Sequence, residues 1–232
     1  MGRKSKGRSG QQAVRRAFTR KLLAWWAHAA RDLPWRRTRD PYRVLVSEFM
    51  LQQTQVSRVA EYYPRFLERF PDLGALARAR PRAVREAWDG LGYYARASNL
   101  HALARVVSKG LDGTLPDRPE ELIKLPGIGP YTAGAVACFA YEKPVPAVDT
   151  NVARVLRRVF IGDNRAPRTA HRAVWELAGA LVPKNGRRAW KFNQAIMELG
   201  ALICVARKPK CPVCPVRTNC KTGRRRDDRA DG

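Results

Sequence analysis

The stretch Leu125-Pro126-Gly127-Ile128-Gly129-Pro130-Tyr131-Thr132 is a glycine turn between two segments with helical patterns. The segment before it begins at Asp117-Arg118-Pro119-Glu120, where Asp117 is the predicted N-cap and proline occupies the first turn. Gly127 and Gly129 allow backbone angles that other residues resist, and they leave amides pointing outward at the start of the second helix. Such amides suit a phosphate group, although an ordinary corner between two helices has the same pattern.

The rest of the chain also has helical patterns. Apolar residues recur at three- and four-residue steps in many segments, and only residues 145–148 resemble a short extended stretch. The predicted fold class is therefore all-α. The predicted helices cover approximately residues 13–30, 41–60, 62–70, 73–79, 81–88, 99–107, 132–141, 150–160, 171–182 and 189–203.

The net charge of +25 predicts a polyanionic partner, and nucleic acid is the first candidate. Residues 1–21 carry eight basic side chains and no acid, and residues 205–232 carry nine against three acids, which leaves +11 for residues 22–204. The folded body is therefore basic as well as its ends, although a solvated basic face without a ligand fits the same count. No apolar run approaches the roughly 20 residues of a membrane span, and no signal core follows the basic N-terminus. We expect an intracellular protein without a membrane partner.

Glu48 lies inside an apolar helical stripe. Its neighbours three and four residues away include Val44, Leu45 and Leu51, so we expect its carboxylate at the edge of apolar surroundings. Desolvation raises the pKa of a carboxyl group, as a general acid at neutral pH requires. A buried glutamate paired with one of the many arginines fits the same pattern.

Asp149 directly precedes the helix predicted to start at Thr150, and it is the predicted N-cap of that helix. Capping is the common role of such an aspartate. The positive end of the helix dipole also favours the ionised carboxylate, and a fixed anion can stabilise a cationic transition state.

Four of the five cysteines crowd into the C-terminal part of the chain. An odd total and this crowding argue against a secreted disulfide framework and indicate a ligand cluster. The spacing alone permits zinc or an iron–sulfur centre. The predicted ligands are Cys204, Cys211, Cys214 and Cys220, whereas Cys138 is predicted to lie in the core.

Taken together, six segments resemble helix-hairpin-helix DNA glycosylases of the endonuclease III superfamily, and MutY-type adenine DNA glycosylases most of all. The resemblance covers nearly the whole chain from about Leu22 to Cys220. The cysteine spacing is the one that this superfamily uses for a structural [4Fe–4S] cluster, which the resemblance favours over zinc. The matching segments are Leu33–Arg36, Ser47–Val56, Gly90–Arg96, Leu125–Thr132, Val148–Val152 and Phe192–Gly200.

The resemblance implies two helical domains with the substrate cleft between them. A basic flexible arm at 1–12 and a flexible tail at 221–232 are expected to flank them. Residues 37–146 would form a six-helix module with the helix-hairpin-helix at 117–140, and residues 13–36 and 147–220 would form the cluster domain. A monomer that acts on double-stranded DNA in the cytoplasm, associated with the nucleoid, is expected.

The resemblance also implies roles for individual residues. Glu48 would protonate a base flipped out of the duplex, and Asp149, facing it across the cleft, would stabilise the sugar cation. Tyr131 and Asn151 match residues close to the reacting sugar. Bifunctional relatives carry a lysine where this chain has Tyr131, so a monofunctional glycosylase with little or no strand cutting is predicted. The base pocket would comprise Leu33, Trp35, Arg36, Val56 and Glu198, and the DNA contacts Gln53, Tyr93, Gly127, Ile128, Gly129 and Thr132.

The base that is released remains open at this stage. Adenine mispaired with guanine or 8-oxoguanine is favoured, and thymine or uracil opposite guanine is the alternative. Full-length adenine glycosylases of this type continue into a domain that checks for 8-oxoguanine, whereas this sequence ends at Gly232, so weak discrimination of that lesion is expected. A DNA-binding module without catalysis is a third possibility, against which the two carboxylates count.

Overall fold

The computed structural model describes residues 3–162 and 167–223, with side chains for residues 10–162 and 171–223. These residues are largely helical, with no β-strand among them, and the predicted all-α class is confirmed. They belong to two compact units, here called unit 1 (up to Arg31 and from Pro144 onward) and unit 2 (Asp32–Lys143). The observed boundaries lie five and three residues before those predicted at 36/37 and 146/147.

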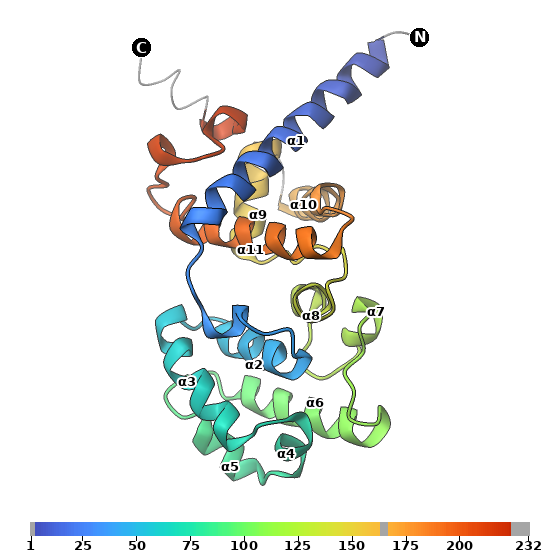
Figure 1. The fold of residues 1–232 in the computed structure, drawn as a ribbon, viewed down its shortest axis with the longest axis vertical. Helices are drawn as coiled ribbons and strands as arrows, with labels where there is room; N and C mark the ends of the chain where they lie inside the picture. Colours follow the sequence, from blue (N-terminus) through green and yellow to red (C-terminus); the bar gives the residue numbers. More distant parts are fainter. Residues whose placement is uncertain (1–2, 163–166, 224–232) are drawn as a thin grey trace. The chain divides into compact units, whose positions relative to one another are not determined.

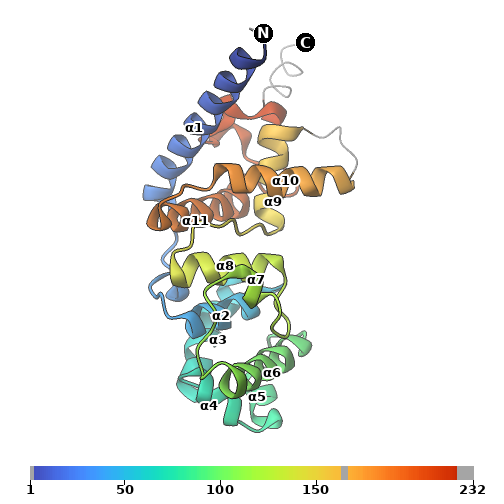
Figure 2. The same ribbon diagram turned by 90° about the vertical axis from the view of Figure 1, so that its right-hand side faces the viewer.

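Unit 2 is a bundle of short helices. In it α8 lies alongside α2, while α4 and α5 lie beside α6 (Figure 2). A short 3-10 turn, Pro34–Arg36, precedes the bundle. The helices are α2 (Pro41–Leu51), α3 (Val56–Arg69), α4 (Leu73–Arg78), α5 (Pro81–Ala87), α6 (Ala95–Gly110), α7 (Pro119–Leu122) and α8 (Pro130–Tyr141).

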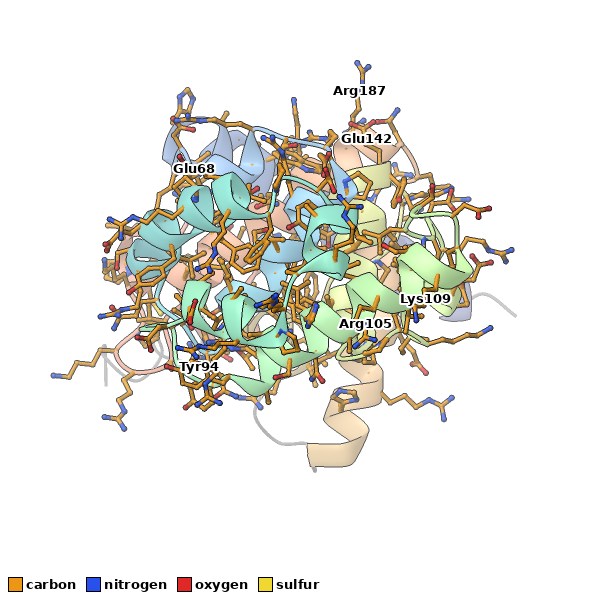
Figure 3. The ribbon with its side chains drawn as sticks, turned by 90° about the horizontal axis from the view of Figure 1, so that it is seen from below. Glu68, Tyr94, Arg105, Lys109, Glu142 and Arg187 are labelled. Carbon is orange, nitrogen blue, oxygen red and sulfur yellow. The ribbon has the colours of Figure 1, made fainter. Side chains whose placement is uncertain are left out.

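The amphipathic pattern of α6 accounts for its place in unit 2. Leu100, Leu103 and Val107 are fully buried beneath α4 and α5. Arg105 and Lys109, one turn apart, are exposed and lie close together on the outer side of the helix (Figure 3). The helix therefore contributes apolar contacts to the core and positive charge to the surface.

The predicted helix over residues 41–60 is wrong in one respect, because it is broken in two. Asp40 caps α2 through the amide of Arg43, as an aspartate before proline favours. The helix ends at Leu51, and Gln53 adopts a left-handed conformation with φ 56° before α3 begins at Val56. The break is stabilised by a distant residue, Arg96, which binds the carbonyl groups of Met50 and Gln52. The local sequence does not show this contact.

The helix-hairpin-helix is formed by α7 and α8. Gly127 has φ +74°, a conformation that favours glycine, whereas Gly129 is extended with φ −97°. The predicted N-cap Asp117 is not the cap: Arg118 holds that position without a side-chain bond, and Asp117 instead pairs with Lys143.

Unit 1 joins the two ends of the chain. The first helix, α1 (Arg3–Ala29), lies beside α11 (Gly186–Leu202), which packs on α9 (Thr150–Leu156) (Figure 1). Phe18 of α1 packs edge-on against Phe160 and Phe192, so residues far apart in sequence share one core. The remaining helix is α10 (Pro167–Leu181). A short π-helical turn at Arg157–Ile161 directly follows α9, and short 3-10 turns at Cys211–Val213 and Arg217–Asn219 follow α11.

The two ends of the chain differ in what can be compared with the sequence. The backbone of α1 begins at Arg3, so the predicted arm at 1–12 is helical from that residue on. The predicted tail at 221–232 lies mostly outside the described residues. No helix in the described part of the chain is long and apolar enough to cross a membrane.

The two hairpin glycines make a matched pair for mutation. A Cβ at Gly127 would lie 2.7 Å from Cβ of Asn99 and 3.0 Å from the ring of Phe49, whereas a Cβ at Gly129 meets nothing within 4 Å. We expect Gly127→Ala to lower the free energy of unfolding by about 2 kcal/mol or more, because it adds left-handed strain to a clash. Gly129→Ala should change it by less than about 1 kcal/mol. Urea unfolding of the two variants measures the difference, and equal effects would contradict this account of the turn.

Candidate functional site

In unit 2 the buried carboxyl group of Glu48 meets the hairpin. Glu48 lies in the middle of α2 with 4% of its surface exposed. The hydroxyl of Tyr131, in the first turn of α8, donates a hydrogen bond of 2.7 Å to Oε2 of Glu48. Packing of α2 on α8 brings these residues together across 83 positions of sequence. The glycine turn thus positions a side chain against the predicted general acid.

Two exposed side chains of unit 2 stand on left-handed turns. Gln53 has φ 56° and Tyr93 has φ 48°, and 62% of the surface of Tyr93 is exposed. A non-glycine residue in this conformation is uncommon and costs about 1–2 kcal/mol. An exposed aromatic ring on a strained turn is a candidate for insertion into a ligand such as stacked bases.

The hairpin itself offers backbone more than side chains. Ile128 and Thr132 are buried at 7% and 3% exposure, so their predicted DNA contacts rest on main-chain groups. The first-turn amides of α8 have no carbonyl one turn earlier to bind, as at any helix start. A phosphate fits that arrangement.

In unit 1 Asp149 is the N-cap of α9, as predicted. Its Oδ1 accepts a hydrogen bond of 2.7 Å from the amide of Val152, and its Oδ2 accepts one of 2.9 Å from the side chain of Asn151. Burial raises the pKa of Asp149, and the bonds from Val152 and Asn151 oppose this rise only in part. The expected stabilisation of the anion by the helix start is present, but desolvation is the larger effect.

The segment that leads into Asp149 is held by α11. The buried side chain of Asn193 donates to the carbonyl of Val145 at 3.0 Å and accepts from the amide of Ala147 at 3.2 Å. Both main-chain groups belong to a stretch without regular structure, so this one side chain supplies hydrogen bonds that secondary structure would otherwise provide. Asn193 thereby fixes the approach to the carboxylate.

A chain of hydrogen bonds connects Asp149 with the cysteine loop. Arg154 donates to Oδ1 of Asn151 at 2.6 Å, to the carbonyl of Gly200 at 2.8 Å and to the carbonyl of Cys204 at 2.7 Å. A Cβ at Gly200 would lie 2.6 Å from Cβ of Asn151, so α9 and α11 can approach this closely only because position 200 is glycine. The carboxylate, its amide partner and the loop are therefore one connected network.

The four predicted ligands line one cavity. The cavity holds about 460 Å³ of space, open solvent included, and Arg158 beside it donates to Sγ of Cys204 at 3.4 Å and to loop carbonyls. No group of three or more His, Cys, Asp or Glu side chains in the described residues is arranged to hold a metal ion. Cys204, Cys211, Cys214 and Cys220 all face this cavity as free thiols.

The electrostatics of the cavity fit a cationic centre. Burial raises the pKa of Cys214 to about 11 and also raises that of Cys220. Four thiolates so close together need positive charge to compensate them, and thiolates are the ligands of iron–sulfur clusters. The choice between zinc and an iron–sulfur cluster at these four cysteines stays a prediction.

The predicted base-pocket residues fall in both units. Leu33 and Trp35 are buried in unit 2, where Trp35 packs edge-on against Tyr63, and Arg36 and Val56 are half-buried. Glu198 belongs to unit 1, and its role in a base pocket stays a prediction, as does the facing of Glu48 and Asp149.

Glu198 forms an ion pair with Arg31 that the sequence did not suggest. Arg31 donates to Oε1 at 2.8 Å and to Oε2 at 2.8 Å, and its amide donates to Oε1 at 3.1 Å. The glutamate is 1% exposed, so its carboxylate is directed to Arg31 and not to open solvent. Arg31 is the last residue of unit 1 before unit 2, which makes this pair an anchor for the connection.

Sequence reasoning missed the residues that hold the site. Four are arginines, which do not stand out in a chain with 45 basic residues, and one is an amide inside an apolar helix. The only sequence signal for Asn193 and Arg96 is that they lie in the matching segments Phe192–Gly200 and Gly90–Arg96. These residues are Arg31, Arg96, Arg154, Arg158 and Asn193.

Comparison with protein families identifies the group to which these features belong. Residues 46–179 match the family model described as HhH-GPD superfamily base excision DNA repair protein. The adenine DNA glycosylase of Mycolicibacterium smegmatis is 48% identical over 84% of this chain, and that of Rattus norvegicus is 44% identical over 90%. This chain covers 66% of the first relative and 42% of the second.

Solved structures give the same group. A thermostable thymine-DNA glycosylase superposes with a TM-score of 0.85 at 34% identity, covering 93% of this chain and 99% of that one. A trapped endonuclease III–DNA covalent intermediate superposes with a TM-score of 0.78 at 25% identity, covering 94% and 98%.

The raised pKa of Asp149 predicts a pH-dependent effect of Asp149→Asn on stability. Because the folded state binds this proton more tightly than the unfolded state, wild-type stability falls as pH rises from about 3.9 through the folded-state pKa. The carboxamide of asparagine does not titrate, but it has one acceptor oxygen and so loses one of the two bonds that Asp149 accepts. The melting temperature of the variant relative to the wild type should therefore be higher at pH 7 than at pH 4.

The control is Asp72→Asn, because Asp72 caps α4 through the amide of Ala75 but is exposed. It should show little change in melting temperature at either pH. A melting-temperature difference between Asp149→Asn and the wild type that does not rise in favour of the variant from pH 4 to pH 7 would contradict the dominance of desolvation.

Proposed function

The chain belongs to the HhH-GPD superfamily of base excision DNA repair proteins, and from this premise we propose that it is a monofunctional DNA glycosylase that removes adenine mispaired with guanine or 8-oxoguanine. The observation that carries the proposal is the buried carboxyl group of Glu48, held by Tyr131 of the hairpin at 2.7 Å. Identities of 44–48% to adenine DNA glycosylases support the choice of base. The protein is expected to act as a monomer on duplex DNA in the nucleoid.

Glu48 is the proposed general acid. It protonates N7 of the flipped adenine, the bond between the base and C1′ of the sugar breaks, and its electron pair leaves with the base. Burial on α2 supports this role, because a general acid at neutral pH has to keep its proton. The hydrogen bond from Tyr131 to Oε2 fixes the orientation of this carboxyl group.

Asp149 is the proposed partner of the sugar cation. Its carboxylate is fixed by Val152 and Asn151, so it needs little reorganisation when positive charge develops on the sugar. Water then adds to C1′ and releases a proton, which yields an abasic site and free base. A carboxylate whose burial disfavours its charge gains most from meeting a cation.

The identity of residue 131 supports hydrolysis without strand cutting. A Schiff base with the sugar requires an amine, and the residue against Glu48 is a tyrosine. DNA would be held by main-chain amides at the start of α8, while Gln53 and Tyr93 enter the base stack.

A second candidate is removal of thymine or uracil opposite guanine. The thermostable thymine-DNA glycosylase, of which this chain covers 99%, favours it. The lower identity of 34% makes it the alternative to adenine.

The four cysteines are the proposed ligands of a structural [4Fe–4S] cluster. When bound, it would compensate part of the charge of the four thiolates and hold the loop without taking part in the reaction. Arg158 and Arg154 bind the carbonyl groups of that loop. Arg154 also donates a hydrogen bond to the side chain of Asn151, so the position of the loop affects that of Asn151.

The activity test uses duplexes that carry A:8-oxoG, A:G, T:G or U:G, followed by alkali to reveal abasic sites. We expect release of adenine, and Glu48→Gln and Asp149→Asn should each reduce it at least about 100-fold while duplex binding stays nearly unchanged. Release of pyrimidines alone would establish the alternative. Binding without release from any mispair would identify a non-catalytic module, and loss of folding in both variants would assign the carboxylates a structural role.

The cluster is tested by metal analysis of the purified protein. We expect visible absorbance and about four iron atoms per chain, and Cys211→Ala should lower both. Cys138→Ala is the matched control, because Cys138 is fully buried in α8 of unit 2. A colourless protein loaded with zinc would contradict the iron–sulfur cluster.

A further inference from the structure

The guanidinium group of Arg96 is buried in unit 2 and gathers acceptors from two separate turns. Arg96 is 7% exposed at the start of α6. Its Nη1 donates to the carbonyls of Phe49 at 3.1 Å and Met50 at 2.8 Å, and also to that of Gln52. Phe49 and Met50 belong to the last turn of α2, whose free carbonyls favour a cation.

The other nitrogen of the same group binds the second turn. Nη2 donates to the carbonyls of Leu91 and Gly92, each at 3.0 Å, and to Oγ1 of Thr54 at 3.0 Å. One planar group therefore joins the segment 49–54 to the segment 91–92. The two segments are about 40 positions apart in sequence and share this side chain.

Two of the three exposed, left-handed, non-glycine residues described in unit 2 adjoin these acceptors, and the third, Asp112, lies elsewhere. Gln53 lies between the acceptors Gln52 and Thr54, and Tyr93 directly follows the acceptor Gly92. The guanidinium carbon of Arg96 is 5.6 Å from the ring centre of Tyr93 and 5.5 Å from that of Trp88. Arg96 thus supports the exposed ring from the protein side and fixes the backbone on which it stands.

No carboxylate lies within ion-pair distance of Arg96 among the described residues, and carbonyl oxygens and ring faces take that place. A lysine could not replace it, because an ammonium group is a point donor and cannot reach both turns at once. The bonds go to the two protruding turns and to the end of the helix that carries Glu48. An arginine needed only for the core would not require this distribution.

We propose that Arg96 is a positioning residue that locks the turns of Gln53 and Tyr93 into one rigid element for entry into the DNA base stack. The inference rests on the proposed function, since it takes duplex DNA as the ligand of this surface. Strain at both turns is maintained because a single cation binds the carbonyls of each. When substitution removes the guanidinium group of Arg96, both turns should relax together.

The test compares Arg96→Lys with the wild type in two measurements. In amide hydrogen exchange of the free protein, residues 50–54 and 90–94 should exchange about tenfold faster in the variant, while the core of α6 keeps its protection. On a duplex with 2-aminopurine beside an A:8-oxoG mispair, the fluorescence rise that reports unstacking should be lost. The preference for mispaired over matched duplex should fall about tenfold, with the salt dependence of binding unchanged, because phosphate contacts remain.

Arg85→Lys is the matched control. The guanidinium carbon of Arg85 lies 4.6 Å from the ring centre of Tyr94, and Arg85 is exposed, so the same substitution removes an arginine–aromatic contact beside the second turn while the bonds from Arg96 to both turns remain. It should leave exchange and fluorescence unchanged. If Arg96→Lys does not fold, Thr54→Val removes one acceptor and should loosen both segments to a smaller extent.

The outcomes separate this inference from the proposed function. Loosening of one turn alone, or a wild-type fluorescence rise in Arg96→Lys, would overturn the inference. If the wild type unstacks no mispair, the proposed function fails, and the exchange measurement still decides whether Arg96 couples the turns.

Discussion

The hydrogen bond between Tyr131 and Glu48 is the contact on which unit 2 depends for its chemistry. A carboxyl group in the middle of a buried helix has to be held by a partner, and here the partner comes from the first residues of the hairpin helix. The turn at Gly127 directs α8 against α2, and Arg96 binds carbonyl groups in the last turn of α2, which ends three residues beyond Glu48. The helix that carries Glu48 leads directly into the turn of Gln53, and Arg96 joins its end to the turn of Tyr93, so the predicted acid and these two predicted DNA contacts share one scaffold.

Unit 1 has the opposite requirement, since the role proposed for Asp149 needs a charged carboxylate. Its bonds to Asn151 and Val152 only partly offset burial, and Arg154 ties the amide partner to the cysteine loop. In such a site, burial makes the charged form of the carboxylate less favourable, and a nearby cation would offset this desolvation cost. The arginines around the loop therefore support two functions, folding of the C-terminal segment and orientation of Asp149.

Local signals in the sequence predicted the helical class, the cap at Asp149 and the turn at Gly127, because each depends on a few neighbouring residues. Contacts between distant segments were not predictable in the same way. The break after Leu51 is stabilised by Arg96, more than forty positions away, and Glu198 is held by Arg31 across 167 positions. The assignment of Asp117 as a cap failed because Lys143 from the far end of the hairpin takes its carboxylate. Family resemblance supplied the roles of Glu48 and Asp149, which spacing alone left open.

The π-helical turn at Arg157–Ile161 restricts which insertions and deletions this segment can accept during evolution. It follows α9 directly, and its wider winding accommodates one residue more than an α-helix would in the same length. Arg158 lies within it and reaches the carbonyls of Val205 and Ala206. Removing one residue would restore regular winding and rotate the following side chains by about 100°, away from the loop. The number of residues between Asp149 and Gly162 is therefore constrained as strictly as their identity, and insertions or deletions should be tolerated elsewhere in unit 1 before they are tolerated here.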